Sequence, residues 1–366
     1  MNDEKLMKRA FELAKKGEGK VLTNPIVGAV IVKDGRIIGE GYHHAYGELH
    51  AERDAFNNLS EDANGASLYV NLEPCSHYGK QPPCVDEVIK RGIKEVFISN
   101  IDTNPKVDGI KKLKAHGIEV YTGILEEEGK KLNEVFFFNM KYKRPLVALK
   151  YAMTLDGKIA CANGDSKWIS NEKSREYVHK LRSKYDAILV GKNTAINDNP
   201  SLNSRIEDGI DPVRIIIDSK LDLPEDLKIF DLESDKKTYI ATCSDKENPY
   251  KADLIRCKEK DGQVDLNDLL KKLYDMNISS VLVEGGSVIN NSFLEEGLVD
   301  RIYEFISPKI VSGEKSISPF TGKGVDYMAD AYKFEIENVS RFDTDVLLEV
   351  KNVHWNIWRI RSGNRI

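Results

Sequence analysis

The residues best suited to chemistry in this sequence are a histidine, a glutamate and two cysteines. They are His50 and Glu52, which are separated by one residue, and Cys75 and Cys84 further along the chain. One imidazole and two thiolates suit Zn²⁺, and three protein ligands leave its fourth position open for water, as in catalytic sites. Bound zinc lowers the pKa of that water toward neutrality. In such motifs the glutamate is not a ligand but transfers protons to the ring nitrogen and the leaving ammonia. The pattern therefore predicts a zinc-dependent deaminase centre.

A structural zinc site is the main alternative, because structural sites have four Cys or His ligands. His77 is the candidate for the fourth ligand, although it lies very close to Cys75 in the chain. Eight residues separate the two cysteines where two are common, and Gly79 with Pro82-Pro83 predicts a rigid turn long enough to reach over a substrate. Cys84 precedes a predicted helix over 85–91, so we expect the positive end of that helix to favour its thiolate.

The segments around these residues resemble the deaminase domain of the bifunctional riboflavin-biosynthesis deaminase–reductases. The resemblance is carried by residues 24–28, 50–52, 74–79 and 82–84. It implies a cytidine-deaminase-like layered α/β domain. The implied substrate is 2,5-diamino-6-ribosylamino-4(3H)-pyrimidinone 5′-phosphate, which loses its ring C2 amino group. The turn after residue 104 is shorter than the family's glycine-rich turn. The resemblance implies substrate contacts at Asn24, His43, Lys80, Asp102 and Asn104.

In the second half, Gly285-Gly286 lies between a predicted strand, 280–284, and a predicted helix, 287–296. Backbone N–H groups at the start of a helix can bind phosphate. Two glycines are also what a tight strand-to-helix turn requires, and local evidence favours that simpler reading. Lys150 and Glu284 lie near strand ends, where they could polarise a carbonyl or an imine. They could equally form a structural ion pair.

Five further segments resemble, in the same order, the reductase domain of the same bifunctional family: 155–160, 165–169, 198–202, 217–219 and 283–286. That domain is similar to dihydrofolate reductase in fold and uses NADPH, whose nicotinamide transfers hydride. Met153-Thr154 departs mildly from the family pattern. The resemblance implies cofactor contacts at Ala152, Trp168, Thr194, Asp198, Ser219, Gly286, Ser287, Val288, Ile289, Asn290, Asn291 and Ser292. It implies substrate contacts at Ser166, Arg182, Leu202, Arg205 and Glu284, and the two guanidinium groups suit a phosphate.

Hydrophobic periodicity predicts the elements that position these residues. In the first half these are a helix over 3–16, a hairpin over 27–42 and a helix over 50–59. Strands and helices then alternate, and a charged helix over 126–143 precedes Arg144-Pro145. The second half alternates again, with strands at 146–152, 187–191, 213–217, 238–242 and 280–284, helices at 171–184, 265–276 and 287–296, and closing strands at 301–311 and 345–350. We therefore expect two α/β domains, a deaminase domain over 1–144 and a reductase domain over 145–366.

Composition restricts the class of protein. The 366 residues are 41% hydrophobic and carry a net charge of −5, so no basic field indicates a nucleic-acid surface. No apolar run is long enough to span a bilayer, and the N-terminus lacks the pattern of a signal peptide. Five scattered cysteines favour a reducing, cytoplasmic location over a disulfide framework.

These observations together predict a bifunctional enzyme that acts on a small phosphorylated pyrimidine with Zn²⁺ and NADPH. A homo-oligomer, dimer or tetramer, is expected from strand pairing between reductase domains. One rival is a single-function deaminase with a non-catalytic second domain. Another is an RNA-binding protein on a zinc-stabilised scaffold. Residues 352–366, with Trp355 and Trp358, are either a packed extension or a loose tail.

Overall fold

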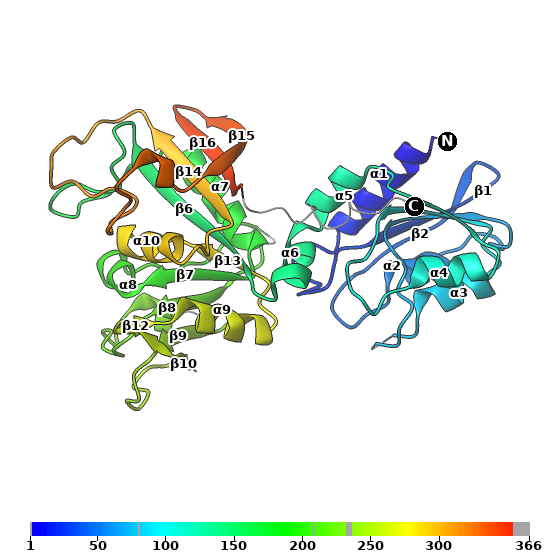
Figure 1. Ribbon diagram of the computed structural model, residues 1–366, viewed down its shortest axis with the longest axis horizontal. Helices are drawn as coiled ribbons and strands as arrows, with labels where there is room; N and C mark the ends of the chain where they lie inside the picture. The colour runs from blue at the N-terminus through cyan, green and yellow to red at the C-terminus, as the bar shows by residue number, and fades with distance from the viewer. Residues whose placement is uncertain (1, 80, 208, 232–235, 354–366) are drawn as a thin grey trace. The chain divides into compact units, whose positions relative to one another are not determined.

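A computed structural model describes residues 2–79, 81–207, 209–231 and 236–353. Lys80 and most of the predicted extension, including Trp355 and Trp358, lie outside the described residues. The chain divides into two compact units, Met1–Lys143 and Arg144–Ile366, which we describe separately (Figure 1).

The first unit contains a five-stranded sheet in the order β2-β1-β3-β4-β5. Its strands are β1 (Gly28–Lys33), β2 (Arg36–Tyr42), β3 (Ser67–Leu72), β4 (Glu95–Asn100) and β5 (Glu119–Thr122). The predicted hairpin forms the antiparallel pair β1–β2, and β3, β4 and β5 run parallel. Parallel strands need crossover connections, which the helices between them supply.

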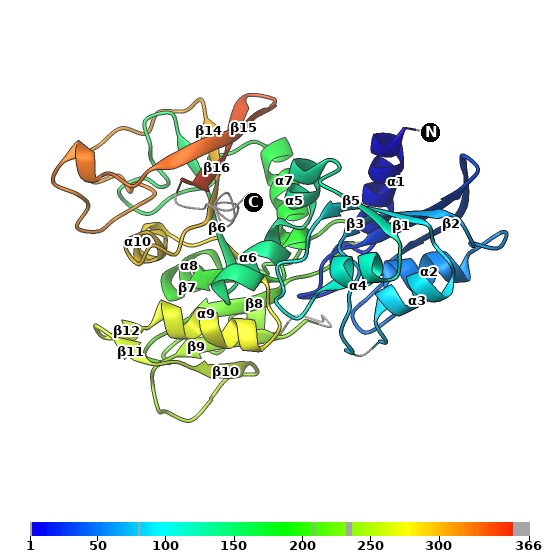
Figure 2. The ribbon, with the colours of Figure 1, turned by 45° about the vertical axis from the view of Figure 1, so that its right-hand side comes forward.

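Helices cover both faces of this sheet (Figures 1 and 2). On one face, Ala29 and Ile31 of β1 pack with α2 (Ala51–Asn57), α3 (Cys84–Lys90) and α4 (Gly109–Ala115). On the other, Val30 and Val32 pack with α1 (Asp3–Lys15). Successive side chains of a strand point to opposite faces, so β1 is apolar throughout because both its faces are buried.

The charged segment predicted as one helix over 126–143 is two helices, α5 (Glu126–Leu132) and α6 (Glu134–Tyr142). Asn133 separates them. Its side-chain oxygen accepts from the Ile26 N–H at 2.9 Å, and its amide donates to the Ile26 carbonyl at 2.9 Å. This contact joins residues 107 positions apart. It fixes the chain next to Asn24, one of the predicted substrate contacts.

The second unit is built on a nine-stranded sheet in the order β10-β9-β8-β7-β13-β6-β14-β16-β15. Seven strands run parallel, from β10 to β14, and β16 and β15 add an antiparallel edge. The strands are β6 (Leu146–Thr154), β7 (Ala187–Gly191), β8 (Val213–Ile217), β9 (Thr238–Thr242), β10 (Asp253–Arg256), β13 (Ser280–Val283), β14 (Arg301–Ser307), β15 (Phe334–Phe342) and β16 (Asp345–Asn352). A separate small hairpin joins β11 (Glu259–Lys260) and β12 (Gln263–Val264).

Helices again pack on both faces of the sheet. α9 (Leu266–Asp275) and α10 (Ser287–Glu295) contribute Leu269, Leu273 and Phe293 to the core on one face. α8 (Lys192–Asp198) contributes Ala195 to the core on the other. Short 3-10 turns occur at Lys228–Phe230 and Met328–Asp330. The sequence analysis missed α8, β10 to β12 and β15, and the strand predicted over 301–311 ends at Ser307.

The start of α7 (Glu172–Lys184) is tied to the antiparallel edge of the second sheet. Asp345, buried at the beginning of β16, accepts from the Asn171 N–H at 2.7 Å and from the Ser174 hydroxyl at 2.7 Å. The Asn171 side chain caps the helix by accepting from the Ser174 N–H. These bonds fix the position of the first turn of α7, which faces the cleft described below.

Candidate active sites

The three predicted metal ligands come together in the first unit. His50 precedes α2, Cys84 is the first residue of α3, and Cys75 lies in the loop after β3. The Nδ1 atom of His50 is 3.4 Å from Cys75 Sγ and 3.3 Å from Cys84 Sγ. All three donor atoms lie within 4.8 Å of one another.

This arrangement fits a tetrahedral Zn²⁺. Zn–S bonds of about 2.3 Å and Zn–N bonds of about 2.0–2.1 Å place neighbouring ligand atoms roughly 3.5–3.8 Å apart. The separations from His50 Nδ1 to the two sulfurs are close to this range. His77, the alternative fourth ligand, does not belong to the donor group found among the described residues. The geometry is therefore that of a site with three protein ligands.

The helix end beside the metal ligands acts on a different cysteine from the one we expected. Cys84 is itself the first residue of α3, and its backbone N–H donates to Cys75 Sγ at 3.3 Å. Hydrogen bonds from Cys84 and His50 hold the pKa of Cys75 at about 4. Its hydrogen bond with Cys75, together with burial, raises the pKa of Cys84. The N–H group at the start of α3 thus stabilises the Cys75 thiolate.

A cavity of about 320 Å³ opens beside the metal ligands. Glu52, buried in the first turn of α2, lines it. Burial raises the pKa of Glu52, so this carboxyl group readily holds a proton. Of the predicted substrate contacts, the structure places Asn24, His43, Asp102 and Asn104 on the same cavity. Lys80 lies outside the described residues.

Two of these residues form a defined pair. The Nδ1 atom of His43 lies 3.0 Å from the Leu49 carbonyl, and its Nε2 atom lies 3.3 Å from the amide nitrogen of Asn24. Burial lowers the pKa of His43, which favours the neutral ring. A neutral ring that donates from Nδ1 accepts at Nε2, so it orients the Asn24 amide with its oxygen available to a ligand.

Glu73 organises the far side of this cavity, and sequence analysis did not identify it. This buried carboxylate accepts from the Asp102 N–H at 3.2 Å and from the Ile110 N–H at 3.0 Å. It thereby fixes both ends of the shortened turn after residue 104. Burial, assisted by the nearby charge of Glu73, raises the pKa of Asp102 to about 6. In the sequence, the only signal that could have identified Glu73 is its position immediately before Pro74-Cys75.

The second unit contains a larger cleft of about 1420 Å³. It lies at the carboxyl ends of parallel strands, where Gly191, Ile217 and Glu284 end or follow β7, β8 and β13. The structure places most of the predicted cofactor and substrate residues on this cleft: Lys150, Ala152, Ser166, Trp168, Arg182, Thr194, Asp198, Leu202, Arg205, Ser219, Glu284, Gly286, Ser287, Val288, Ile289 and Ser292.

Two predicted cofactor contacts, Asn290 and Asn291, do not line the cleft. Both are buried, and the Asn290 amide donates to the Pro319 carbonyl at 3.1 Å. The Asn291 amide packs so closely on Gly322 that a side chain there would collide with it. Successive residues of a helix point about 100° apart, so the side chains of residues 287–292 cannot all face one cleft.

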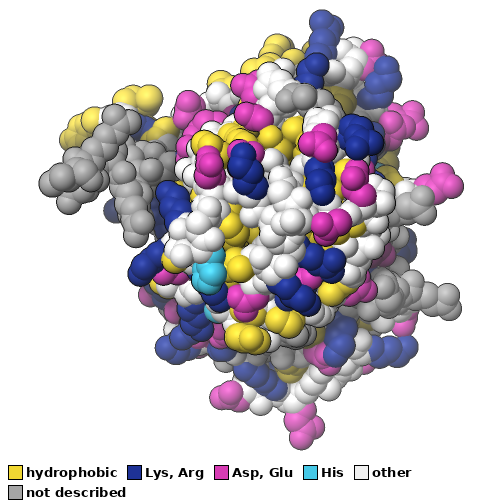
Figure 3. Space-filling model, turned by 90° about the vertical axis from the view of Figure 1, so that its right-hand side faces the viewer, with side chains coloured by type: hydrophobic (Ala, Val, Ile, Leu, Met, Phe, Trp, Pro, Cys, Tyr) yellow, Lys and Arg dark blue, Asp and Glu magenta, His cyan; other side chains and the backbone are white. Residues whose placement is uncertain are grey.

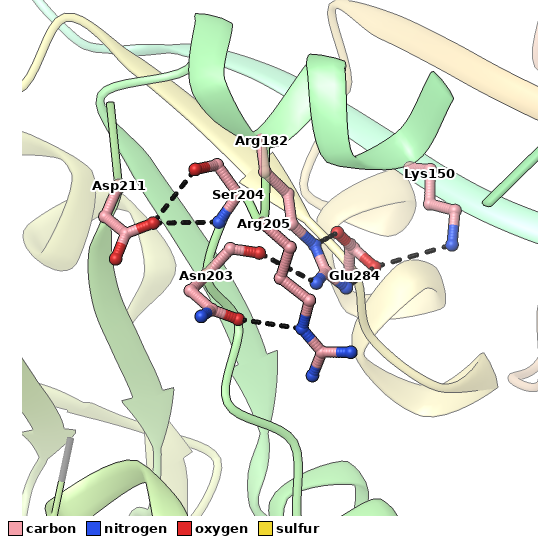
Figure 4. A network of polar contacts seen from close by, with 7 residues as sticks. All are labelled: Lys150, Arg182, Asn203, Ser204, Arg205, Asp211 and Glu284. Carbon is pink, nitrogen blue, oxygen red and sulfur yellow. Dashed lines mark hydrogen bonds and ion pairs between the residues drawn. The ribbon is translucent and has the colours of Figure 1, made fainter. Parts of the chain in front are cut away.

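A buried carboxylate joins two cations at the centre of this cleft (Figure 4). Glu284 accepts from Arg182 at 2.7 Å and 3.0 Å, and lies 3.4 Å from the Lys150 ammonium. Burial alone would raise the pKa of Glu284, but the charges of Arg182 and Lys150 outweigh it and lower the pKa to about 2. The carboxylate is therefore ionised throughout the physiological range.

The two predicted phosphate-binding arginines differ in their surroundings. Arg182 is committed to Glu284, and its remaining contact is to the Asn203 carbonyl at 3.2 Å. Its guanidinium fork is thus occupied by a carboxylate instead of being free for a phosphate. Arg205 is exposed and makes one hydrogen bond, to the Asn203 side chain at 3.1 Å, so it is the arginine that remains accessible.

Sequence analysis did not identify every residue that lines this cleft, and two of those it missed are the cation Arg175 and the imidazole of His179, whose pKa is lowered by burial. Both lie on α7 with Arg182. Their spacing of four and three residues places all three on one face of a helix. That spacing is the signal that would have identified them.

Comparisons with known proteins match the two halves of the chain to different families. Residues 145–348 match the family model described as the RibD C-terminal domain. Residues 1–100 match the model of the cytidine and deoxycytidylate deaminase zinc-binding region. The riboflavin biosynthesis protein RibD of Actinobacillus pleuropneumoniae is 45% identical over 95% of each chain. RibD of Aquifex aeolicus is 43% identical over 92% of this chain and 96% of its own.

Solved structures are similar over the whole chain as well. A Thermotoga maritima protein described as a diaminohydroxyphosphoribosylaminopyrimidine deaminase/5-amino-6-(5-phosphoribosylamino)uracil reductase is 44% identical. It has a TM-score of 0.87 and covers 96% of this chain and 98% of its own. Acinetobacter baumannii RibD is 35% identical with a TM-score of 0.85. These matches confirm the predicted family resemblance and the predicted α/β fold class of both halves.

The buried Arg182–Glu284 pair leads to a prediction about stability. Arg182→Ala should destabilise the second unit by about 3–5 kcal/mol at pH 7, because it leaves a buried carboxylate without its main partner. Arg205→Ala is the matched control and should change stability by less than about 0.5 kcal/mol, since its side chain is exposed. Calorimetric unfolding of both variants measures the difference.

The same pair predicts a pH dependence. The pKa of Glu284 is held near 2, below its ordinary value of 4.5. Its contribution to stability is therefore fully present above that ordinary value and is lost as the pH falls toward 2. The difference in the free energy of unfolding between the wild type and Arg182→Ala should therefore become smaller as the pH falls from 4.5 toward 2. If this difference stays constant from pH 7 to pH 3, the destabilisation does not come from the Glu284 carboxylate.

Proposed function

This chain belongs to the RibD family of riboflavin-biosynthesis proteins, and we propose that it catalyses two successive reactions on one phosphorylated pyrimidine. The first is hydrolytic deamination of 2,5-diamino-6-ribosylamino-4(3H)-pyrimidinone 5′-phosphate at the zinc site. The second is NADPH-dependent reduction of the ribosyl chain to ribityl. The observation that carries the proposal is the presence of two separate sites in one chain, a three-donor metal group beside a buried glutamate and a cleft around Lys150 and Glu284. We assign the deaminase to residues 1–144 and the reductase to 145–366.

In the deaminase site, His50, Cys75 and Cys84 would hold a zinc ion. When bound, the metal would supply a water molecule of lowered pKa as the nucleophile. Glu52 holds and transfers protons between the attacking water, the ring nitrogen and the leaving amino group, which suits its raised pKa. Asn24, oriented by His43, and the Asp102–Asn104 turn are the groups proposed to bind the pyrimidine and its sugar. Lys80 remains a predicted phosphate contact.

In the reductase site, NADPH supplies the hydride. The start of α10 at Gly286 and Ser287 presents backbone N–H groups for a cofactor phosphate. Gly286 leaves room there, since the nearest atom to a side chain at this position is the Thr194 hydroxyl at 3.6 Å. Lys150 is proposed to donate a proton to the sugar, and Glu284, kept ionised by Arg182, orients the Lys150 ammonium.

The partners proposed for this chain are its small-molecule ligands and further copies of itself. Within the described residues, no helix is both long enough and apolar enough to cross a membrane. The five cysteines are free, which supports a reducing, cytoplasmic location. On the face drawn in Figure 3, Lys and Arg side chains are interspersed with Asp and Glu side chains. Such mixed charge argues against the alternative of an RNA-binding scaffold.

The first activity prediction concerns Glu52. Glu52→Gln keeps the size of the side chain but cannot transfer a proton, so ammonia release should fall by at least ~10²-fold. Zinc content should remain at one per chain, whereas Cys84→Ala should lose the metal because two ligands hold it poorly. NADPH oxidation with pre-deaminated substrate should be unchanged in both variants. Undiminished ammonia release by Glu52→Gln would show that the deaminase mechanism is wrong.

The second activity prediction concerns the cofactor. The full-length protein should bind NADPH more tightly than NADH in a calorimetric titration. Gly286→Asp should abolish binding, because a carboxylate would stand where the cofactor phosphate approaches the start of α10. Ammonia release by this variant should equal that of the wild type. A wild type that neither binds NADPH nor oxidises it would favour the single-function deaminase.

A further prediction concerns assembly. β15 is an edge strand, and its Ile336 and Val339 side chains are 58% and 60% exposed. An exposed apolar edge strand favours pairing with another chain, so we propose a homo-oligomer, dimer or tetramer, that uses this edge. Light scattering should detect it at micromolar concentration, and Val339→Lys should shift it toward the monomer. The proposed interface is rejected if Val339→Lys leaves the mass of the oligomer unchanged.

A further inference from the structure

We propose that Arg175 is a positioning residue of the reductase site, which acts by holding the indole of Trp168 against the cleft where the cofactor binds. The inference rests on the proposed reductase function, because Trp168 is among the residues predicted to contact NADPH. Arg175 does not belong to that predicted set. Three observations support the role: two concern contacts of the segment 168–170, and the third concerns the start of α7.

The first observation is a stacked contact between the two side chains. The guanidinium carbon of Arg175 lies 4.6 Å from the centroid of the Trp168 ring. This distance is well within the range of a cation–π interaction, and tryptophan is the aromatic side chain that binds cations best. Both residues line the cleft, and Trp168 remains 64% exposed. The guanidinium therefore covers one face of the indole and leaves the other side open to a ligand.

The second observation is that the backbone that carries the indole is fixed by cations on two sides. Arg175 donates from Nη1 to the Ser170 carbonyl at 2.6 Å. Lys309, which follows β14, donates to the Trp168 carbonyl at 2.5 Å and to the Ile169 carbonyl at 3.0 Å. An exposed loop with three such charge-assisted bonds has few alternative conformations. The indole is thus held in place before any ligand arrives.

The third observation is that Arg175 itself has a rigid support. It lies in the first turn of α7, whose start is tied to the sheet edge through Asn171, Ser174 and the buried Asp345. Arg175 thus connects the sheet to the indole within a few residues. This short, anchored connection distinguishes it from an arginine that merely rests on a surface tryptophan.

The expected consequence is preorganisation of the cofactor site. A free exposed indole occupies several rotamers, and a ligand must select one of them on binding. With Arg175 stacked on the ring, the Trp168 side chain already occupies a single rotamer before the cofactor binds. Loss of the stacking should therefore weaken NADPH binding by roughly 2- to 30-fold, the effect of about 0.5–2 kcal/mol of cation–π energy.

The test is calorimetric titration of the full-length protein with NADPH. Arg175→Ala should raise the Kd by the amount above, and Arg175→Lys should give an intermediate value, because lysine keeps the charge but loses the planar fork. Lys173→Ala removes an exposed cation of the same helix that does not line the cleft, and should bind NADPH as the wild type does. A cooperative calorimetric unfolding transition of the second unit in every variant shows that this unit is folded.

A double-mutant cycle separates positioning from a direct contact with the cofactor. If Arg175 acts through the indole, Arg175→Ala should weaken binding less than twofold in a Trp168→Ala background. The proposal is overturned if Arg175→Ala and Arg175→Lys bind NADPH as the wild type does, or if Arg175→Ala has the same effect in both backgrounds. Absence of NADPH binding by the wild type would instead reject the reductase assignment, and this inference with it.

Discussion

Both sites depend on the same constraint, which is that a carboxylate removed from water must be paired with a cation, accept hydrogen bonds or take up a proton. Glu52 in the first unit and Glu284 in the second are both buried beside a cavity, and their surroundings act on them in opposite ways. Glu284 lies between Arg182 and Lys150, and its pKa falls to about 2. Glu52 lies among a histidine and two cysteines, and its pKa is raised by burial. One carboxyl group is therefore a fixed negative charge, and the other has a raised pKa that suits it to hold a proton.

This difference agrees with the chemistry proposed for each unit. Hydrolytic deamination moves protons at several atoms in turn, so it needs a group that both accepts and releases them. Hydride transfer from a nicotinamide needs placement and a single proton path. A permanently ionised Glu284 cannot donate that proton, but it can orient the Lys150 ammonium at 3.4 Å, which can. Arg182, for which a substrate phosphate contact was predicted, bonds to Glu284 in the structure and lowers the pKa of that carboxyl group.

The metal ligands and Glu52 could be predicted from the sequence because zinc chemistry restricts both the residue types and their spacing. Residues that act through distant contacts could not. Glu73 bonds to the N–H groups of residues 29 and 37 positions away, and the break between α5 and α6 depends on a contact across 107 positions. β15 was missed because its apolar side chains lie on an exposed edge, where no regular burial pattern forms. The family resemblance supplied many of the residues on the reductase cleft but not Arg175, which contacts the ring of Trp168 and the backbone of Ser170. It also did not supply Lys309, which does not line the cleft and bonds to the backbone of residues 168 and 169.

The buried positions of Asn290 and Asn291, away from the cleft, show how the start of α10 is held in place. A helix start binds an anion only if its N–H groups point in a fixed direction. The two buried asparagines fix that direction from the far side of the helix, Asn290 through its bond to the Pro319 carbonyl and Asn291 through close packing on Gly322. The Thr321 N–H adds a bond to the Ser287 carbonyl in the first turn. The segment 319–322 thus fixes the orientation of α10, as Asp345 fixes the orientation of α7. In both cases a helix that faces the cleft is oriented by a buried polar contact on its opposite side, so that its exposed residues remain available to the ligands.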